Sequence, residues 1–276
     1  MRGEFVDVGG HRLYYYAAGS RGVGEPVLFL HGTAATSHLW HSVIPCMPAG
    51  HRLVVADLLG CGRSDRPDGE PLTADAHALR AIALMDDLGI EAACIVGHGA
   101  GGAVATAMAL SAPWRVSRLA LVNAVAFDKW TRGAAPVARL LARLSLGRLV
   151  GAPVLAGMAH GAMLRGFADR ERGRHTLDQF LLPYAQRLGV DALVAQLRSM
   201  RRDPGVAELG ARLGAIRQPT SVVWGADDPW LSPAIGARLA AEIADATLDV
   251  IPGASHYAPI DAPERVAAQL AALLLR

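Results

Sequence analysis

The sequence of 276 residues is poor in cysteine, has a single lysine and lacks any long uncharged apolar run. The three cysteines, Cys46, Cys61 and Cys94, do not have the spacing of a metal site and cannot all pair with one another. This usage favours a reducing compartment, so we expect a cytoplasmic protein. Residues 1–5 lack the apolar stretch of a signal peptide, and the missing long apolar runs predict no stable membrane insertion.

Hydrophobic residues make up 52% of the chain, so we expect one large domain, or a core with an insertion. The net charge of +2 conceals an asymmetry. Residues 128–217 hold fourteen arginines and Lys129 against seven acidic residues, which gives +8, whereas the remainder holds twelve arginines against eighteen acidic residues, which gives −6. The basic segment is either a solvated helical surface or an attractor of an anionic substrate or lipid surface. Aromatic residues are not interleaved with the arginines, which disfavours nucleic acid as a partner.

Strand and helix patterns alternate along most of the chain, which is typical of a mainly parallel sheet with helices on both faces. Short apolar runs predict six strands after an antiparallel opening pair, and apolar residues at helical spacing predict helices between them. The expected strands are Phe5–Val8, Arg12–Ala17, Val27–Leu30, Leu53–Ala56, Cys94–Val96, Leu119–Val122, Thr220–Trp224 and Thr247–Ile251. The expected helices are Ala74–Leu88, Ala100–Ser111, Pro233–Ile243 and Pro263–Leu275.

The alternation stops after the sixth strand, and the region from Pro136 to Arg212 contains only helical patterns. A helical insertion between two strands of such a sheet forms a cap over the carboxyl ends of the strands, where ligands bind. We therefore predict a core formed by residues 1–127 and 218–276, with a helical cap at residues 128–217.

Four signals that carry chemistry follow the ends of predicted strands. The glycine-rich segment Gly97–Gly101 allows a sharp turn from strand to helix, with a positive φ at its middle residue, Gly99. A base on the loop after the last strand can reach both this turn and a carboxylate at a neighbouring strand end. The four signals are His31-Gly32-Thr33, Gly97-His98-Gly99-Ala100-Gly101, Asp228 after Gly225, and His256 after Gly253.

Taken in this order, the signals resemble the α/β-hydrolase superfamily over nearly the whole chain. The segment Asp57–Asp65 also resembles the D-x-x-G-x-G-x-S motif of that family. The resemblance implies an α/β fold with a mainly parallel eight-stranded sheet and a helical cap inserted after strand 6. It also implies that His256 is the general base, Asp228 the orienting acid and Gly99 the position of the nucleophile. The N–H groups of Thr33 and Ala100 would then form the oxyanion hole.

The departure from the family is Gly99, where the family has serine, aspartate or cysteine. Three explanations stay open: a different mechanism, a non-catalytic ligand-binding protein, or a nucleophile-deleted variant of a serine hydrolase. We expect Cys94 in the strand core and Ser255 against the loop backbone, and Cys61 has no base nearby in the sequence. No replacement nucleophile is therefore evident.

Several residues near these signals are candidates to line a substrate pocket, although packing or helix capping is the alternative role for most of them. They are His31, Gly32, Trp40, His98, Asp128 and Trp130. Ala100 stands where haloalkane dehalogenases often have tryptophan, and Ala34 where many epoxide hydrolases have proline. The resemblance therefore favours cleavage of a small, partly apolar ester, lactone, thioester or carbon–carbon substrate.

Gly97, Gly99 and Gly102 also match the G-x-G-x-x-G fingerprint of dinucleotide-binding proteins. The next predicted strand ends at Asn123 instead of the acid that would hold a ribose, and this reading leaves Asp228 and His256 without a role. We therefore expect a small-molecule substrate, no cofactor and no metal. Whether that substrate is anionic and whether the chain forms a homodimer stay open.

Overall fold

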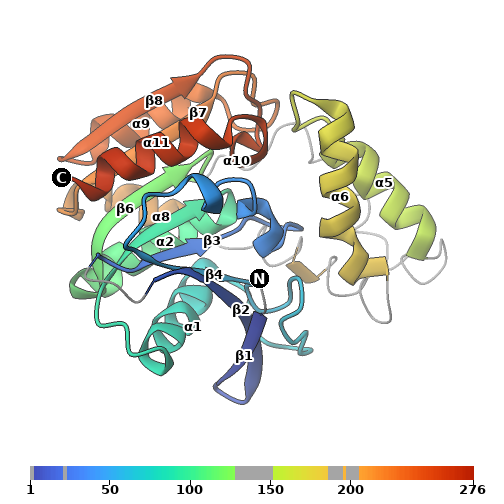
Figure 1. Cartoon of the computed structure of the whole chain (residues 1–276), viewed down its shortest axis with the longest axis horizontal. Helices are drawn as coiled ribbons and strands as arrows, with labels where there is room; N and C mark the ends of the chain where they lie inside the picture. The colour runs from blue at the N-terminus through green and yellow to red at the C-terminus, as the bar shows by residue number, and fades with distance from the viewer. Residues whose placement is uncertain (1–2, 21–23, 128–151, 186–194, 197–204) are drawn as a thin grey trace.

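The computed structural model describes residues 3–20, 24–127, 152–185, 195–196 and 205–276. Within these ranges eight strands form one sheet in the order β1-β2-β4-β3-β5-β6-β7-β8 (Figure 1). β2 pairs antiparallel with β1 and β4, and all other neighbours are parallel, which confirms the predicted sheet. The strands are β1 Gly3–Val8, β2 His11–Gly19, β3 Val27–Leu30, β4 Arg52–Ala56, β5 Ala93–His98, β6 Val116–Val122, β7 Thr220–Gly225 and β8 Ala246–Ile251.

Apolar layers cover both faces of the sheet. Alternate strand residues, such as Leu30 and Ile95, pack against α1, α2, α8 and α9. Their sequence neighbours, such as Phe29 and Val96, pack against η1, η2, α10 and α11, as the two-residue period of a strand requires. These helices are α1 Ala74–Asp87, α2 Ala100–Ser111, α8 Gly205–Ala211, α9 Pro233–Glu242, α10 Ala258–Asp261, α11 Pro263–Leu274, η1 Ser37–Trp40 and η2 Ile44–Cys46, with short turns η3 Pro113–Arg115 and η4 Leu213–Ala215.

The turn from β5 into α2 depends on small residues. A Cβ atom at Gly97 would lie 2.3 Å from the carbonyl oxygen of Gly101, and one at Gly101 would lie 2.5 Å from the carbonyl oxygen of Leu30. Both contacts are far shorter than van der Waals separation. The glycines therefore let the first turn of α2 press against the carboxyl ends of β3 and β5.

Helices α5 (Ala152–Leu164) and α6 (Arg170–Ala185) belong to the predicted cap and lie beside one another at one side of the sheet (Figure 1). Leu177 and Phe180 of α6 are buried in the same apolar cluster as Tyr257. The connection between α5 and α6 is also tied to the core, because the Tyr257 N–H donates to the Gly166 carbonyl oxygen at 3.0 Å.

The last described helices of the predicted cap, α8 and η4, pack against the core of the protein. Val206 and Leu209 of α8 and Leu213 of η4 pack in the same apolar cluster as α2, on the core side. The sequence shows the helical spacing of this segment but not its packing partner. Residues 128–151 lie outside the described residues, so the cap limits of 128 and 217 stay a prediction. In the described part of the chain, no helix combines the length and apolar character needed to cross a bilayer.

Candidate active site

Gly99 occupies the sharp turn between β5 and α2 with φ 54° and ψ −120°. This backbone conformation is strained for any residue with a side chain. A Cβ atom at this position would nevertheless find room, because its nearest neighbours would be the Gly32 Cα at 3.4 Å and the His256 Nε2 at 3.8 Å. The Gly99 carbonyl oxygen accepts from the Gly102 and Val125 N–H groups at 3.1 and 2.8 Å, which fixes the turn.

The structure brings together His256 and Asp228 at the carboxyl edge of the sheet. The His256 Nδ1 donates to the Asp228 Oδ2 at 2.8 Å, which leaves its Nε2 as the acceptor facing Gly99. The Asp228 Oδ1 accepts from the Trp230 and Leu231 N–H groups at 2.8 and 3.0 Å. Burial acts to raise the pKa of Asp228, but the charge and hydrogen bond of His256 with these two N–H groups outweigh it, so the pKa lies below its ordinary value.

Asn123 completes this arrangement, and the sequence reasoning gave it no such role. Its Nδ2 donates to the Asp228 Oδ2 at 2.8 Å, and its Oδ1 accepts from the Gly225 N–H at 3.2 Å. Asn123 is fully buried and follows β6 with φ 41°. Its position as a polar residue at a strand end on the carboxyl edge was the signal available in the sequence.

Aromatic rings surround His256 on several sides. The ring centroids of Trp230 and His98 lie 4.7 and 4.8 Å from that of His256, both at steep angles. The His98 Nε2 donates to the His256 carbonyl oxygen at 3.0 Å, and burial lowers the pKa of His98 to about 3. Trp40 is fully buried and packs on Phe29 with centroids 5.2 Å apart. His98 therefore packs against His256, and Trp40 packs against Phe29 and His98.

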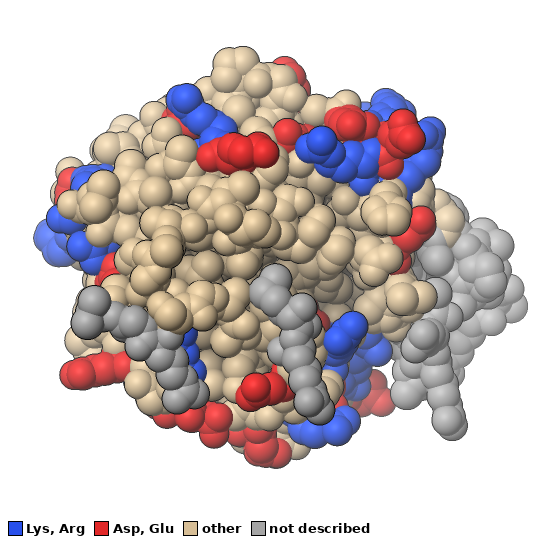
Figure 2. All heavy atoms as spheres, in the orientation of Figure 1, with Lys and Arg blue, Asp and Glu red and all other residues tan. Residues whose placement is uncertain are grey.

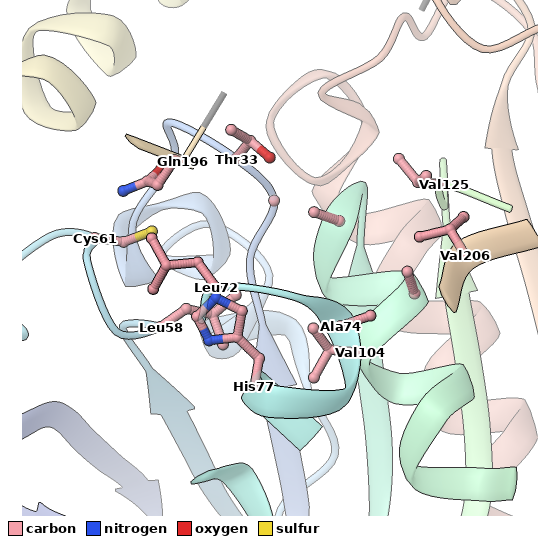
Figure 3. A pocket seen from close by; sticks show the side chains of 13 residues that line it. Thr33, Leu58, Cys61, Leu72, Ala74, His77, Val104, Val125, Gln196 and Val206 are labelled. Carbon is pink, nitrogen blue, oxygen red and sulfur yellow. The ribbon is translucent and has the colours of Figure 1, made fainter. Parts of the chain in front are cut away.

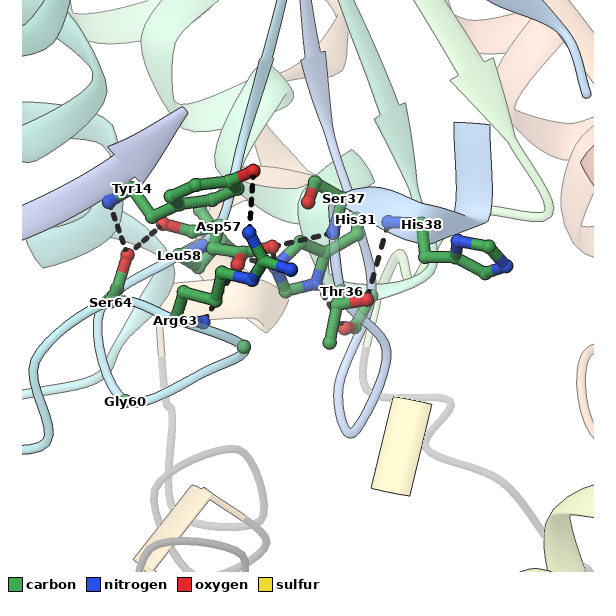
Figure 4. A network of polar contacts seen from close by, with 12 residues as sticks. Tyr14, His31, Thr36, Ser37, His38, Asp57, Leu58, Gly60, Arg63 and Ser64 are labelled. Carbon is green, nitrogen blue, oxygen red and sulfur yellow. Dashed lines mark hydrogen bonds and ion pairs between the residues drawn. The ribbon is translucent and has the colours of Figure 1, made fainter. Parts of the chain in front are cut away.

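His31 holds the loop that carries Gly32 and Thr33. The ring is fully buried, its Nδ1 donates to the Gly32 carbonyl oxygen at 2.7 Å, and its Nε2 accepts from the Leu58 N–H at 3.0 Å (Figure 4). Burial lowers the pKa of His31, so the ring is neutral and matches both partners. The His31 side chain therefore supports this loop through two hydrogen bonds.

Asp57 connects the segment after β3 to the loop after β4. Its buried carboxylate accepts from the Ser37 N–H at 2.5 Å and from the Arg63 N–H at 2.8 Å (Figure 4). A Cβ atom at Gly62 would overlap this carboxylate at 2.1 Å. The D-x-x-G-x-G-x-S segment thus packs a buried acid against two loops, which explains both its aspartate and its second glycine.

A cavity of about 40 Å³ lies beside the turn at Gly99 (Figure 3). Thr33 and Ala100, the predicted oxyanion-hole residues, both line it, together with Gly32 from the predicted pocket set. The wall is mostly aliphatic. The other lining residues are Leu58, Cys61, Leu72, Ala74, His77, Ala103, Val104, Val125, Gln196 and Val206.

Gln196, which lines this cavity, forms hydrogen bonds to three other segments of the chain, and sequence reasoning missed these contacts. Its amide nitrogen donates to the Gly60 carbonyl oxygen and to the Tyr184 hydroxyl, and its Oε1 accepts from the Ala34 N–H at 3.4 Å. It therefore connects the predicted cap to the loop that carries Thr33.

The remaining residues from the sequence analysis are three possible nucleophiles and two candidate pocket residues. Ser255 donates through Oγ to the Asp227 carbonyl oxygen at 3.2 Å, and burial raises the pKa of the Cys61 and Cys94 thiols, that of Cys61 to about 12, so neither thiol is an activated nucleophile. Asp128 and Trp130 lie outside the described residues. No group of metal-ligating side chains occurs among the residues that the structure describes.

None of the described residues that line the cavity is an arginine or a lysine, although the predicted cap is basic. The arginines of the α5–α6 region are exposed, namely Arg165, Arg170, Arg172 and Arg174. Figure 2 shows basic and acidic side chains side by side near the edges of one face, with uncharged residues across its centre. An anionic substrate stays a prediction.

The comparisons with known proteins agree with the fold. The family model described as "alpha/beta hydrolase fold" matches residues 25–263. The chain therefore belongs to the α/β-hydrolase fold family.

Curated relatives of this chain include several hydrolases. Haloalkane dehalogenase 2 of Mycobacterium tuberculosis is 30% identical, over 94% of this chain and 90% of that protein. A 2-hydroxy-6-oxononadienedioate/2-hydroxy-6-oxononatrienedioate hydrolase of Paraburkholderia xenovorans is also 30% identical, over 92% and 87%. Among solved structures, an α/β hydrolase fold protein from Burkholderia ambifaria is 27% identical with a TM-score of 0.88, over 97% of this chain and 96% of that chain.

Proposed function

We propose that this chain is a hydrolase in which His256 activates water directly, without a covalent intermediate on residue 99. The substrate class is a small, partly apolar ester, lactone, thioester or carbon–carbon substrate with a carbonyl group at the site of attack. The hydrolase relatives support the reaction type, and the aliphatic cavity beside Gly99 supports the partly apolar substrate. The tryptophan often found after the nucleophile of haloalkane dehalogenases is absent, because Ala100 follows Gly99.

One observation carries the proposal. The Cβ of a side chain on residue 99 would lie 3.8 Å from the His256 Nε2, so that an atom one bond further could come within the hydrogen-bond distance of about 2.6–3.2 Å that a base needs. With glycine, the same space admits a water molecule between the base and a bound carbonyl carbon. The base is present and oriented, since Asp228 accepts from its Nδ1 at 2.8 Å.

The proposed reaction has two steps. His256 takes a proton from water at Nε2 while the water oxygen bonds to the carbonyl carbon, and the N–H groups of Thr33 and Ala100 stabilise the resulting oxyanion. The imidazolium is stabilised by Asp228. His256 then returns the proton to the leaving oxygen, sulfur or carbon as the tetrahedral intermediate collapses, so the net change is addition of water across the cleaved bond.

The expected rate is modest. Loss of the nucleophile of a serine triad costs about six orders of magnitude, and the remaining elements keep roughly 10³–10⁴ over water. General base catalysis by a positioned histidine contributes about 10²–10⁴. A slow hydrolase with intact binding is therefore the expected behaviour of this site.

A non-catalytic ligand-binding protein is the second candidate. The absence of any side chain at Gly99 favours it, because glycine removes about 1–3 kcal/mol of strain from the turn while removing the nucleophile. A binding protein would hold the ligand in the same cavity and release it unchanged.

Intact-mass spectrometry during turnover distinguishes the proposed mechanism from attack by a different nucleophile and from ligand binding without reaction. We expect the protein to convert p-nitrophenyl butyrate to butyrate with no acyl adduct, whereas the Gly99→Ser variant accumulates one. An adduct on the unaltered chain would show a different nucleophile. Retention of ligand with no product above the buffer rate would identify a binding protein.

A further inference from the structure

His77 is an exception on the inner face of α1. The other buried positions of this helix are apolar, namely Ala74, Ala78, Ala81, Leu84 and Met85. His77 is only 7% exposed and lines the cavity, and Figure 3 shows its ring directed toward Leu72 and Leu58. A leucine would satisfy packing here, so the choice of a polar ring needs another explanation.

One ring nitrogen of His77, Nδ1, is buried and unpaired in the described part of the chain. Buried polar atoms are nearly always paired, and leaving one unpaired is costly. The neighbouring Gln196 amide already bonds to Gly60, Tyr184 and Ala34, so it does not fill this need.

His77 is uncharged in this setting. Burial lowers its pKa to about 3, and its electrostatic interactions with Arg80 and with the His31 side chain act in the same direction. A neutral imidazole offers one donor and one acceptor. It can pair with an uncharged oxygen substituent, but it cannot neutralise a carboxylate in this aliphatic wall.

The geometry sets the size of the group that would reach His77. Ala100 and Val104 line the cavity one turn apart on α2, which spans about 6 Å along the helix. The cavity volume of about 40 Å³ exceeds the roughly 10–15 Å³ that one water needs. A short acyl chain with its carbonyl at Ala100 would therefore share this cavity with the His77 ring.

We propose that the cavity is a binding subsite for a short acyl chain that carries an uncharged hydroxyl or keto group, which His77 recognises through a hydrogen bond. The idea deepens the proposed function, since it assigns the acyl side of that substrate. The binding itself does not depend on hydrolysis.

The test compares two amides of equal size by isothermal titration calorimetry. In 4-hydroxybutyramide a terminal hydroxyl takes the place of the terminal methyl of pentanamide. We expect the unaltered protein to bind the hydroxy compound about fivefold to tenfold more tightly, and the His77→Leu variant to lose that preference. The His11→Leu variant, altered at a histidine that does not line the cavity, should keep it.

A second measurement works on the unaltered protein and does not depend on the stability of the variant. Adding 4-hydroxybutyramide should shift the ¹⁵N resonances of the His77 ring, and pentanamide should shift them less. Equal affinity for the two amides, a preference that survives in His77→Leu, or no binding of either amide would overturn the subsite. If the preference holds while no ester is hydrolysed, the proposed function fails and the subsite stands.

Discussion

Asn123 and His256 donate hydrogen bonds to the same oxygen of Asp228, each at 2.8 Å. The carboxylate is therefore held from two directions by residues that lie far apart in the sequence, and its other oxygen is held by the Trp230 and Leu231 N–H groups. This saturation keeps the carboxylate ionised and fixes the ring of His256.

Replacing Asn123 with aspartate should test how strongly this oxygen is held. The Asn123→Asp variant would place two carboxylates in contact in a buried site, and like charges so close disfavour the ionised pair. We expect the free energy of unfolding to fall by about 2–4 kcal/mol at pH 7, with partial recovery near pH 4 as one group binds a proton.

The matched control is Asn123→Gly, which keeps the positive φ of this position and adds no charge. Urea unfolding at the two pH values measures both variants. An Asn123→Asp variant as stable as Asn123→Gly at pH 7 would contradict the contact.

Restoring a nucleophile at Gly99 should raise the activity. The Gly99→Ser variant places a hydroxyl within reach of the His256 Nε2, and we expect at least about 100-fold faster hydrolysis of p-nitrophenyl butyrate than with the unaltered chain. The Gly99→Ala variant controls for the side chain itself. It should show no gain and lose about 1–3 kcal/mol of stability, because φ 54° strains any Cβ. Equal rates for Gly99→Ser and Gly99→Ala would show that the base or the oxyanion hole does not function.

Two glycines with opposite surroundings should respond in opposite directions to alanine. At Gly101 a Cβ would press on the carbonyl oxygen of Leu30 at 2.5 Å, so we expect a loss of about 2 kcal/mol or more. At Gly161, inside α5, a Cβ would meet no atom of the described residues within 4 Å, so alanine should stabilise the protein by about 0.5–1 kcal/mol. Thermal unfolding of the two variants measures the difference, and a tolerated Gly101→Ala would argue against the close approach of α2 to β3.

Asp228 should contribute to the pH dependence of stability. Its folded-state pKa lies below the ordinary value, so its contribution is present above about pH 4 and is lost as the pH falls through the folded pKa. We expect the stability difference between the unaltered protein and Asp228→Asn to shrink as the pH falls below about 4. The neighbouring Asp227→Asn variant serves as a control. A difference that does not change down to pH 2 would contradict the lowered pKa.

Much of the fold followed from local sequence patterns. The predicted strand Val27–Leu30 and helix Ala100–Ser111 have the observed limits, since apolar runs and helical spacing are properties of neighbouring residues. The proximity of Gly99, Asp228 and His256 was also predictable, because the carboxyl ends of parallel strands meet at one edge.

The contacts that the sequence did not reveal join residues distant along the chain. Asn123 and Asp228 are 105 positions apart, and Gln196 and Ala34 are 162 apart, so no local period encodes either bond. The packing partner of α8 was not predictable either, because its apolar spacing fits a cap helix and a core helix equally well. His98 and Trp40 took packing roles because the rings of His256, Tyr257 and Phe29 surround them.

The kcat/KM of His256→Ala relative to the unaltered protein on p-nitrophenyl butyrate tests the central claim most directly, with His51→Ala, on the loop before β4, as the control histidine. If His256 activates water, the unaltered protein and His51→Ala should hydrolyse the ester above the buffer rate, and His256→Ala should fall by about 10²–10⁴ or to the buffer rate. Equal values of kcat/KM for His256→Ala and the unaltered protein would contradict the account.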